Sequence, residues 1–312
     1  MNWLKLSISI IAAIGLFTHS LESFSKNLQA QADSKLKSIL LNISKSKLRA
    51  FMLGFTATAI IQSSSAVISI VVSFVDAGVL VFKSSLPILL GSNLGTTITA
   101  WLVSFKLEML GTFLIAIGFI LGYFSGKIKL LSKPIFYLGL ILFSLELIGA
   151  NLEPIKESPK LIEFLSLASN PFFGILFGIV ITAICQSSSV TVGLVIILSS
   201  QGILNLDSAI GIIVGSNIGT TTTAFLASLK LGQAAKLSAI ANLCFNTIGV
   251  LIYLPFYKLF EMLITNISSN ITYQVAFAHL IFNLTIGLIL LPFTNYFARI
   301  FQTRLEQIDS KH

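Results

Sequence analysis

One four-residue phrase, Gln-Ser-Ser-Ser, occurs twice in this chain, each time inside a long apolar stretch. The two copies are Gln62–Ser65 and Gln186–Ser189. About thirty residues after each copy comes a second shared phrase, Gly-Ser-Asn-(Leu/Ile)-Gly-Thr-Thr, at Gly91–Thr97 and Gly215–Thr221. Consecutive hydroxyls and amides are costly in hydrocarbon unless they find partners. Their duplication at matched spacing therefore constrains the fold more than any other feature of the sequence.

The composition shows what surrounds these phrases. The 312 residues are 55% hydrophobic and only 10% charged, with a mean hydropathy of +0.93, whereas soluble domains carry about 25% charged residues. The chain is therefore an all-α polytopic membrane protein. Its net charge of +8 does not predict a nucleic-acid partner, because the basic residues lie between apolar runs, as membrane topology requires.

A shift of 124 residues aligns the first half of the chain with the second. Between residues 54–106 and 178–230, 24 of 53 positions are identical without a gap, which indicates duplication and fusion. We predict a first repeat over 1–131 and a second over 132–257. Residues 258–312 then form a final transmembrane helix and a cytoplasmic tail.

Each repeat is predicted to contain a re-entrant helical hairpin and a broken transmembrane helix. The hairpins cover about 48–76 and 172–199. Their arms would span roughly 15–21 Å, too little to cross a hydrocarbon core of about 30 Å, so each Gln-Ser-Ser-Ser becomes a tip near the midplane. The second phrases interrupt longer apolar segments at about 84–105 and 206–229. Their Gly, Asn and Ser residues predict unwinding at those points.

The remaining apolar segments complete a prediction of seven spans. We expect further spans at 4–17, 107–124, 134–150, 236–255 and 273–297, and loops at 151–170 and 258–270. Residues 22–50 are expected to form a basic surface segment, partly an amphipathic helix at the membrane interface. With the N-terminus outside, 15 of the 20 Lys and Arg residues fall on inside faces, as the positive-inside rule requires. This predicts a plasma (inner) membrane protein with a cytoplasmic C-terminus. Three spans in each repeat would invert the second copy, so that the two tips meet around a pseudo-two-fold axis.

The chemistry of such a centre suits an anion accompanied by cations. Serine is a favoured N-cap, and a helix N-terminus presents free N–H groups and a positive dipole end to an anion. Side-chain and backbone oxygens suit a hard cation such as sodium. The four phrases contain no charged residue, so we expect a neutral site. Among residues elsewhere, Glu22 and Glu146 are expected at the interface, while Asn246 and Asn283 could support the centre from outside the hairpins. A packing hydrogen bond is expected for His279.

Together these motifs resemble the type II sodium-dependent phosphate cotransporter family. The resemblance rests on the doubled Gln-Ser-Ser-Ser, on the Gly-Ser-Asn phrase after each copy, and on Ala-His-x-x-Phe-Asn at 278–283. It implies coupled transport of inorganic phosphate with sodium, an inverted-repeat fold and elevator-like motion. The binding residues that it implies are Gln62, Ser63, Ser64, Ser65, Ser92, Asn93, Thr96, Thr97, Gln186, Ser187, Ser188, Ser189, Ser216, Asn217, Thr220 and Thr221. The link 104–108 has no aspartate where some members carry one linked to an additional sodium, so the ion count stays open.

We therefore expect a secondary active transporter and not an enzyme, with sodium as coupling ion, no further cofactor, the lipid bilayer as surroundings, and a homodimer left open. Three alternatives remain at this point. Helix N-termini bind sulfate as well as phosphate, so another oxyanion is one; phosphate export is a second. An intramembrane serine hydrolase using His279 is a third, but it needs one special serine where the sequence has duplicated sets.

Overall fold

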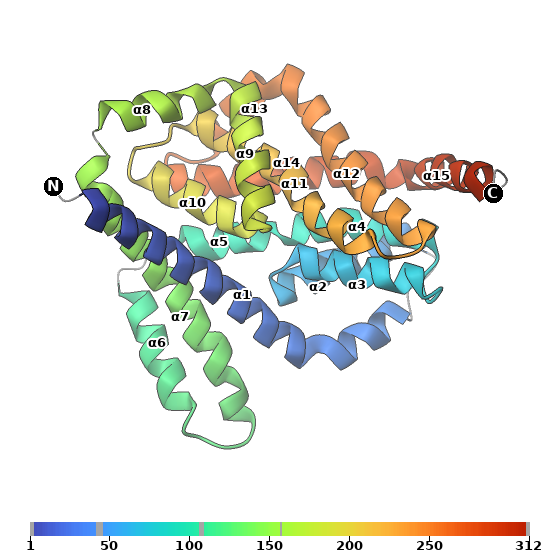
Figure 1. Ribbon diagram of the computed structural model, residues 1–312, viewed down its shortest axis with the longest axis horizontal. Helices are drawn as coiled ribbons and strands as arrows, with labels where there is room; N and C mark the ends of the chain where they lie inside the picture. The colour runs from blue at the N-terminus through green and yellow to red at the C-terminus, as the bar shows by residue number, and fades with distance from the viewer. Residues whose placement is uncertain (1–2, 42–45, 106–108, 157, 310–312) are drawn as a thin grey trace.

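The computed structural model describes residues 3–41, 46–105, 109–156 and 158–309, and within this part of the chain every regular element is helical (Figure 1). The first half holds α1 (Trp3–Leu41), α2 (Lys47–Ile61), α3 (Ser64–Asp76), α4 (Phe82–Gly95), α5 (Thr97–Ser104) and α6 (Leu110–Leu121). The second half holds α7 (Lys127–Leu152), α8 (Pro159–Ser166), α9 (Pro171–Cys185), α10 (Ser188–Ser200), α11 (Leu206–Ser228) and α12 (Gln233–Tyr253). The last part holds α13 (Tyr257–Ile267), α14 (Ile271–Leu290) and α15 (Thr294–Asp309), with short 3₁₀ turns η1 (Glu153–Ile155), η2 (Leu167–Ser169), η3 (Leu254–Phe256) and η4 (Leu291–Phe293).

The helix bounds follow the 124-residue shift seen in the sequence. Both ends of α2 map onto those of α9, and both ends of α3 map onto those of α10. The same shift carries the start of α4 and the end of α5 onto the start and end of α11, and the start of α1 onto that of α7. Duplicated sequence therefore folds into duplicated helices.

Six helical segments of the described chain are long and apolar enough to cross a membrane. They are Leu4–Gln31, Phe82–Ser104, Lys127–Ile155, Leu206–Ser228, Gln233–Ile267 and Ile271–Phe301. A seventh is added if Pro159–Ser169 and Pro171–Cys185, which meet at 105°, count as one broken or re-entrant span. The span predicted at 107–124 is not among them, because α6 has 12 residues and at about 1.5 Å per residue reaches only about 18 Å.

The predicted breaks in the long helices are wrong for the second repeat and slight in the first. Helix α11 continues through Gly215–Thr221 without interruption. Between α4 and α5 only Thr96 is unassigned, and its φ of −61° and ψ of −25° are helical values. The glycines have another use: a Cβ on Gly91 would overlap the backbone of Phe51, and one on Gly215 that of Ile175. They let α2 pack closely on α4, and α9 on α11.

Two segments predicted to be loops contain helices, and the basic surface segment expected at 22–50 is helical as far as residue 41. Residues 22–41 continue the first span as one helix, α1, while residues 42–45 lie outside the described part. The loop expected at 151–170 contains α8, and the loop expected at 258–270 contains most of α13. Both α8 and α13 have one strongly apolar face and one polar face, which a scan of overall hydropathy does not detect.

The arrangement brings the ends of the two hairpins together. In Figure 1 α6 and α7 project from the rest of the molecule as a pair, and α1 runs from beside α7 towards α2. The pairs α2–α3 and α9–α10 lie against the long helices α4 and α11. Helices α12 and α14 pack over both halves, so the polar tips are held within a frame of buried apolar side chains.

Candidate functional site

Each Gln-Ser-Ser-Ser forms the turn between the two helices of a hairpin. The backbone dihedral angles of the two turns are nearly the same. Gln62 follows α2 with φ 59°, and Gln186 follows α9 with φ 53°. These are two of three non-glycine residues with positive φ in the described chain. Left-handed backbone is uncommon outside glycine and costs of order 1 kcal/mol or more, and such strain concentrates at functional sites.

The serines start the second arm of each hairpin, as predicted. Ser63 is the N-cap of α3, and its Oγ accepts a hydrogen bond from the Ala66 amide at 3.2 Å. Ser187 caps α10 in the same way, accepting from the Val190 amide at 3.4 Å. The N–H groups of the first helical residues have no partner within their own helix. Each tip therefore presents backbone donors and the positive end of a helix dipole.

A chain of hydrogen bonds joins the two repeats beside the tips. The Gln62 Oε1 accepts from the Thr99 hydroxyl at 3.0 Å, and the Ser189 hydroxyl donates to Thr99 Oγ1 at 3.4 Å. Thr99 is 3% exposed. Its repeat partner, Thr223, donates to the Gln186 carbonyl at 3.4 Å. Sequence reasoning missed both threonines, although the 124-residue shift aligns them.

The two tips line one cavity of about 400 Å³. All eight residues of the two Gln-Ser-Ser-Ser copies lie on its wall. Helix α1 supplies another side, and a few apolar neighbours close it. The residues added to the predicted set are Thr18, Leu21, Glu22, Ser25, Lys26, Gln29, Ala66, Ile184, Cys185 and Val190.

The wall formed by α1 carries charge, which corrects the expectation of a site lined only by neutral groups. Lys26 Nζ lies 2.5 Å from Glu22 Oε1, and both side chains are more than half exposed. Their spacing of four residues places them on one face of the helix, and that spacing was the available signal. Glu146 lies on a separate, largely apolar cavity of about 440 Å³, so its match to Glu22 in the repeat carries no shared location.

The residues predicted from the second phrases do not lie on this cavity. Their hydroxyls mostly bond back to the preceding turn of their own helix, as membrane serines and threonines commonly do. Thr96, Thr97, Ser216, Thr220 and Thr221 donate to carbonyls three or four residues earlier at 2.7–3.2 Å, and Asn217 donates to the Ile213 carbonyl at 3.1 Å. Ser92 is fully buried, and its hydroxyl has no partner within the part of the chain that the structure describes.

A cluster of asparagine side chains connects α4 to α12. Asn93 Nδ2 lies 3.3 Å from both Asn242 Oδ1 and Asn246 Oδ1. The expected support from Asn246 is thus directed to Asn93. Asn283 donates to the His279 carbonyl at 2.9 Å, but both ring nitrogens of His279 are buried and find no partner among the described residues. The hydrogen bond expected for the His279 ring is therefore not formed with any residue that the structure describes, and the ring is not on the cavity wall.

Helices of membrane-spanning length around a polar cavity define a multi-pass membrane protein of the transporter class. Residues 16–150 and 157–286 match the family model described as Na+/Pi-cotransporter. The chain belongs to the Na+/Pi-cotransporter family, a family of transporters and not of enzymes, which excludes the serine hydrolase.

Relatives extend this assignment over nearly the whole chain. "Uncharacterized protein YqeW" of Bacillus subtilis is 34% identical over 94% of this chain and 96% of its own. "Putative inorganic phosphate export protein YjbB" of Escherichia coli is 30% identical over 95% of this chain, which spans 55% of that protein. "Sodium-dependent phosphate transport protein 2A" of Mus musculus is 35% identical over 41% of this chain and 22% of its own. No solved structure matches.

Proposed function

We propose that this protein is a secondary active transporter that couples sodium to inorganic phosphate through the cavity between the two tips. One observation carries the proposal: both Gln-Ser-Ser-Ser turns, 124 residues apart, line the same cavity. Two helix starts that face one space concentrate backbone donors there. Such an arrangement suits a tetrahedral anion.

Lys26 gives the anion a charged partner on the side facing the tips. Its ion pair with Glu22 is largely exposed, and exposed pairs are weak. An arriving phosphate can therefore replace Glu22 as the partner of Lys26. The helix starts would hold the other side of the phosphate.

Sodium would use the uncharged oxygens of the same region. The hydroxyls of the tips and the Gln62 and Gln186 amides supply hard oxygen ligands. The hydrogen bond of Thr99 to Gln62 brings the end of the first Gly-Ser-Asn phrase beside its tip. We propose that Ser92, Asn93, Thr96 and Thr97, with Ser216, Asn217, Thr220 and Thr221, contribute to sodium sites in a rearranged state.

The architecture proposed for this mechanism is a pair of inverted repeats in the plasma membrane, with the N-terminus outside and the C-terminus inside. The hairpins α2–α3 and α9–α10 would enter from opposite faces. They would move together with α4, α5 and α11 against α1, α6 and α7, an elevator-like alternation. Because α1 carries Lys26, this residue would meet the phosphate in only one of the two states.

Export is the second candidate, and it differs only in direction. The observation that favours it is the similarity to the E. coli putative phosphate export protein, which matches nearly the whole of this chain. A coupled carrier runs in either direction according to its gradients. The binding site proposed here serves both candidates.

Uptake of labelled phosphate into proteoliposomes tests the proposal. We expect an inward sodium gradient to accelerate uptake, and sulfate in excess to compete poorly. Uptake that ignores the sodium gradient would refute the coupling. Uptake that sulfate abolishes would refute the choice of phosphate.

The site assignment has its own test. Ser64→Ala and Ser188→Ala remove hydroxyls from the two tips and should weaken phosphate or sodium dependence at least several-fold. Ser73→Ala and Ser200→Ala are matched controls, because these hydroxyls bond to the carbonyls of Ser69 and Ile197 on their own helices and lie off the cavity. Equal transport by all four variants would remove the tips from the mechanism.

A further inference from the structure

The first residues of three helices lie together at two related places in the fold. One place holds the starts of α2, α4 and α15, and the second holds the starts of α9, α11 and α13. The 124-residue shift relates the starts of α2 and α4 to those of α9 and α11. A second shift, of 37 residues, relates α12–η3–α13 to α14–η4–α15, and both turns read Leu-Pro-Phe. Helices α9, α11 and α13 therefore correspond to α2, α4 and α15. Comparing the two places shows what the second has and the first lacks.

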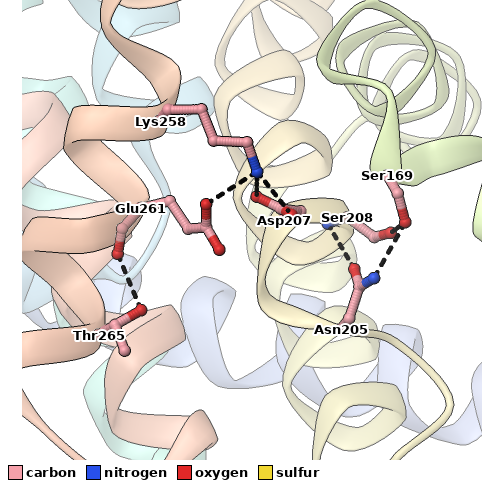
Figure 2. Close-up of polar contacts among 7 residues, drawn as sticks. All are labelled: Ser169, Asn205, Asp207, Ser208, Lys258, Glu261 and Thr265. Carbon is pink, nitrogen blue, oxygen red and sulfur yellow. Dashed lines mark hydrogen bonds and ion pairs between the residues drawn. The ribbon is translucent and has the colours of Figure 1, made fainter.

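In the second repeat, side chains at the starts of α11 and α13 and just before α9 form ion pairs and hydrogen bonds with one another, as Figure 2 shows. Lys258 Nζ lies 3.2 Å from Asp207 Oδ2 and 3.1 Å from Glu261 Oε2. Asn205 caps α11 by accepting from the Ser208 amide at 2.9 Å, and its Nδ2 donates to the Ser169 hydroxyl at 3.0 Å. The Lys258 ammonium therefore has carboxylate partners, and the start of α11 has a side-chain cap, both within the protein.

The start of α9 also has a side-chain cap. Asn170 Oδ1 accepts from the Phe172 amide at 3.0 Å. The starts of α9 and α11 are therefore both capped by asparagine side chains of the protein itself.

In the first repeat the corresponding positions have the opposite chemistry. Lys83 replaces Asp207, and Asn295 and Ala298 replace Lys258 and Glu261. The two carboxylates that pair with Lys258 in the second repeat, Asp207 and Glu261, therefore have no acidic counterpart in the first repeat. Val81 stands where Asn205 caps α11, and Ser46 stands where Asn170 caps α9. Unlike those two asparagines, neither the Val81 nor the Ser46 side chain caps its helix among the described residues.

Three of the changed positions, Ser46, Lys83 and Asn295, line a cavity of about 350 Å³ where the second repeat has an ion-pair cluster. Ser46, Lys47, Ala50, Lys83, Ser84, Pro87 and Asn295 line it. Lys47 Nζ donates to the Pro292 carbonyl at 2.7 Å. Within the described residues no carboxylate pairs with Lys47 or Lys83. At about 30 Å³ per water, the cavity has room for a phosphate group together with water.

We propose that this cavity is a second anion site, separate from the transport cavity, which binds a phosphate group carried by a lipid headgroup or by free inorganic phosphate. The two lysines supply charged donors, and the uncapped starts of α2 and α4 supply backbone N–H groups and favourable dipoles. The bound phosphate takes the role that Asp207 and Glu261 play for Lys258 in the second repeat. It fastens α2, α4 and α15 together at this end of the molecule. The site does not depend on which solute the protein transports.

Native mass spectrometry of the purified full chain tests the site and separates the two sources. The protein is released from nanodiscs of phosphatidylglycerol, from nanodiscs of phosphatidylcholine, or from detergent with added inorganic phosphate. The variants are Lys83→Gln and Lys47→Gln, with Lys129→Gln, an exposed lysine of α7, as the control. Monodisperse elution from a sizing column confirms that each variant is folded.

If a lipid is the ligand, the wild type and Lys129→Gln retain one more phosphatidylglycerol than Lys83→Gln, and phosphatidylcholine shows a smaller difference. If free phosphate is the ligand, the same comparison in detergent shows one fewer bound phosphate in Lys83→Gln. Lys83→Arg should restore the retained ligand in either case. Equal retention of lipid and of phosphate by wild type, Lys83→Gln and Lys47→Gln overturns the proposal. Loss of transport alone, with unchanged retention, overturns it too.

Discussion

Replacing Gly219 by alanine tests the idea that the glycines of the second phrase exist for close helix packing and not for unwinding. Gly219 lies inside α11, which is continuous. A Cβ added there would lie 2.6 Å from Thr182 Cβ and 2.7 Å from the Ile179 carbonyl oxygen of α9. Ordinary contact begins at 3.4 Å. Helix α9 must therefore move away by about 0.8 Å, the difference between 3.4 Å and 2.6 Å.

The displacement reaches the hairpin through Thr182. Its hydroxyl lies 2.7 Å from the Thr191 hydroxyl of α10, and both residues are buried. Overpacking costs about 1–3 kcal/mol, and a lost hydroxyl bond between membrane helices adds about 0.6 kcal/mol. We expect Gly219→Ala to lower the thermal midpoint of the detergent-solubilised protein by several degrees, at roughly 2 °C or more per kcal/mol. Phosphate transport should fall as well, because α9 and α10 carry the second tip.

A matched variant separates packing from helix propensity. Gly15→Ala makes the same replacement in α1, where an added Cβ meets no atom within 4 Å. Alanine favours a helix over glycine by about 1 kcal/mol, so this control should be as stable as the wild type or more so. Thermal scanning with detection by fluorescent size-exclusion chromatography gives both midpoints. Equal or higher stability of Gly219→Ala would refute the close-packing role.

Three further predictions concern the cavity. Thr99→Val keeps the shape of the side chain but removes the donor to Gln62; we expect a several-fold rise in the phosphate KM at near-normal thermal stability, and an unchanged KM would contradict the bridging role. Lys26→Gln should raise the phosphate KM about tenfold, which corresponds to the loss of a charge-assisted hydrogen bond of about 1.5 kcal/mol. Lys26→Arg keeps the charge, so its KM should stay within about threefold of the wild-type value. Equal KM values for the two variants would place Lys26 outside the anion's path. Cys185 lies on the cavity wall as a free thiol, so in a Cys244→Ser background phosphate should slow its modification by a hydrophilic thiol reagent, and modification at the same rate with phosphate or with chloride would argue against binding there.

Much of the local structure could be read from the residues alone. The outer ends of the helix pairs α2–α3 and α9–α10 lie within one residue of the bounds predicted from the Gln-Ser-Ser-Ser phrases and their apolar flanks, because a polar phrase between short apolar runs has few ways to fold in a membrane. The N-caps at Ser63 and Ser187 follow from the same local chemistry. The family followed from the motifs as well.

The second phrases show where such reasoning fails. Gly, Asn and Ser in an apolar helix are compatible with unwinding and equally with close packing, and the choice depends on what lies opposite. Gly91 and Gly215 face the backbones of Phe51 and Ile175, contacts that only the folded chain creates. The hydroxyls of the neighbouring threonines then bond within their own helix, and the helix continues.

The sequence by itself determined that the chain is a duplicated polytopic membrane protein whose two polar turns must be shielded from lipid. That conclusion needs only the cost of burying polar groups and the periodicity of the repeat. Only the tertiary structure decided which groups share a space. It placed Lys26 of α1 on the cavity that both tips line and linked Gln62 to Ser189 through Thr99. It also placed Lys83 on the wall of a cavity, whereas the corresponding Asp207 pairs with Lys258. Contacts between distant segments depend on how whole helices pack, and no local pattern in the sequence specifies that.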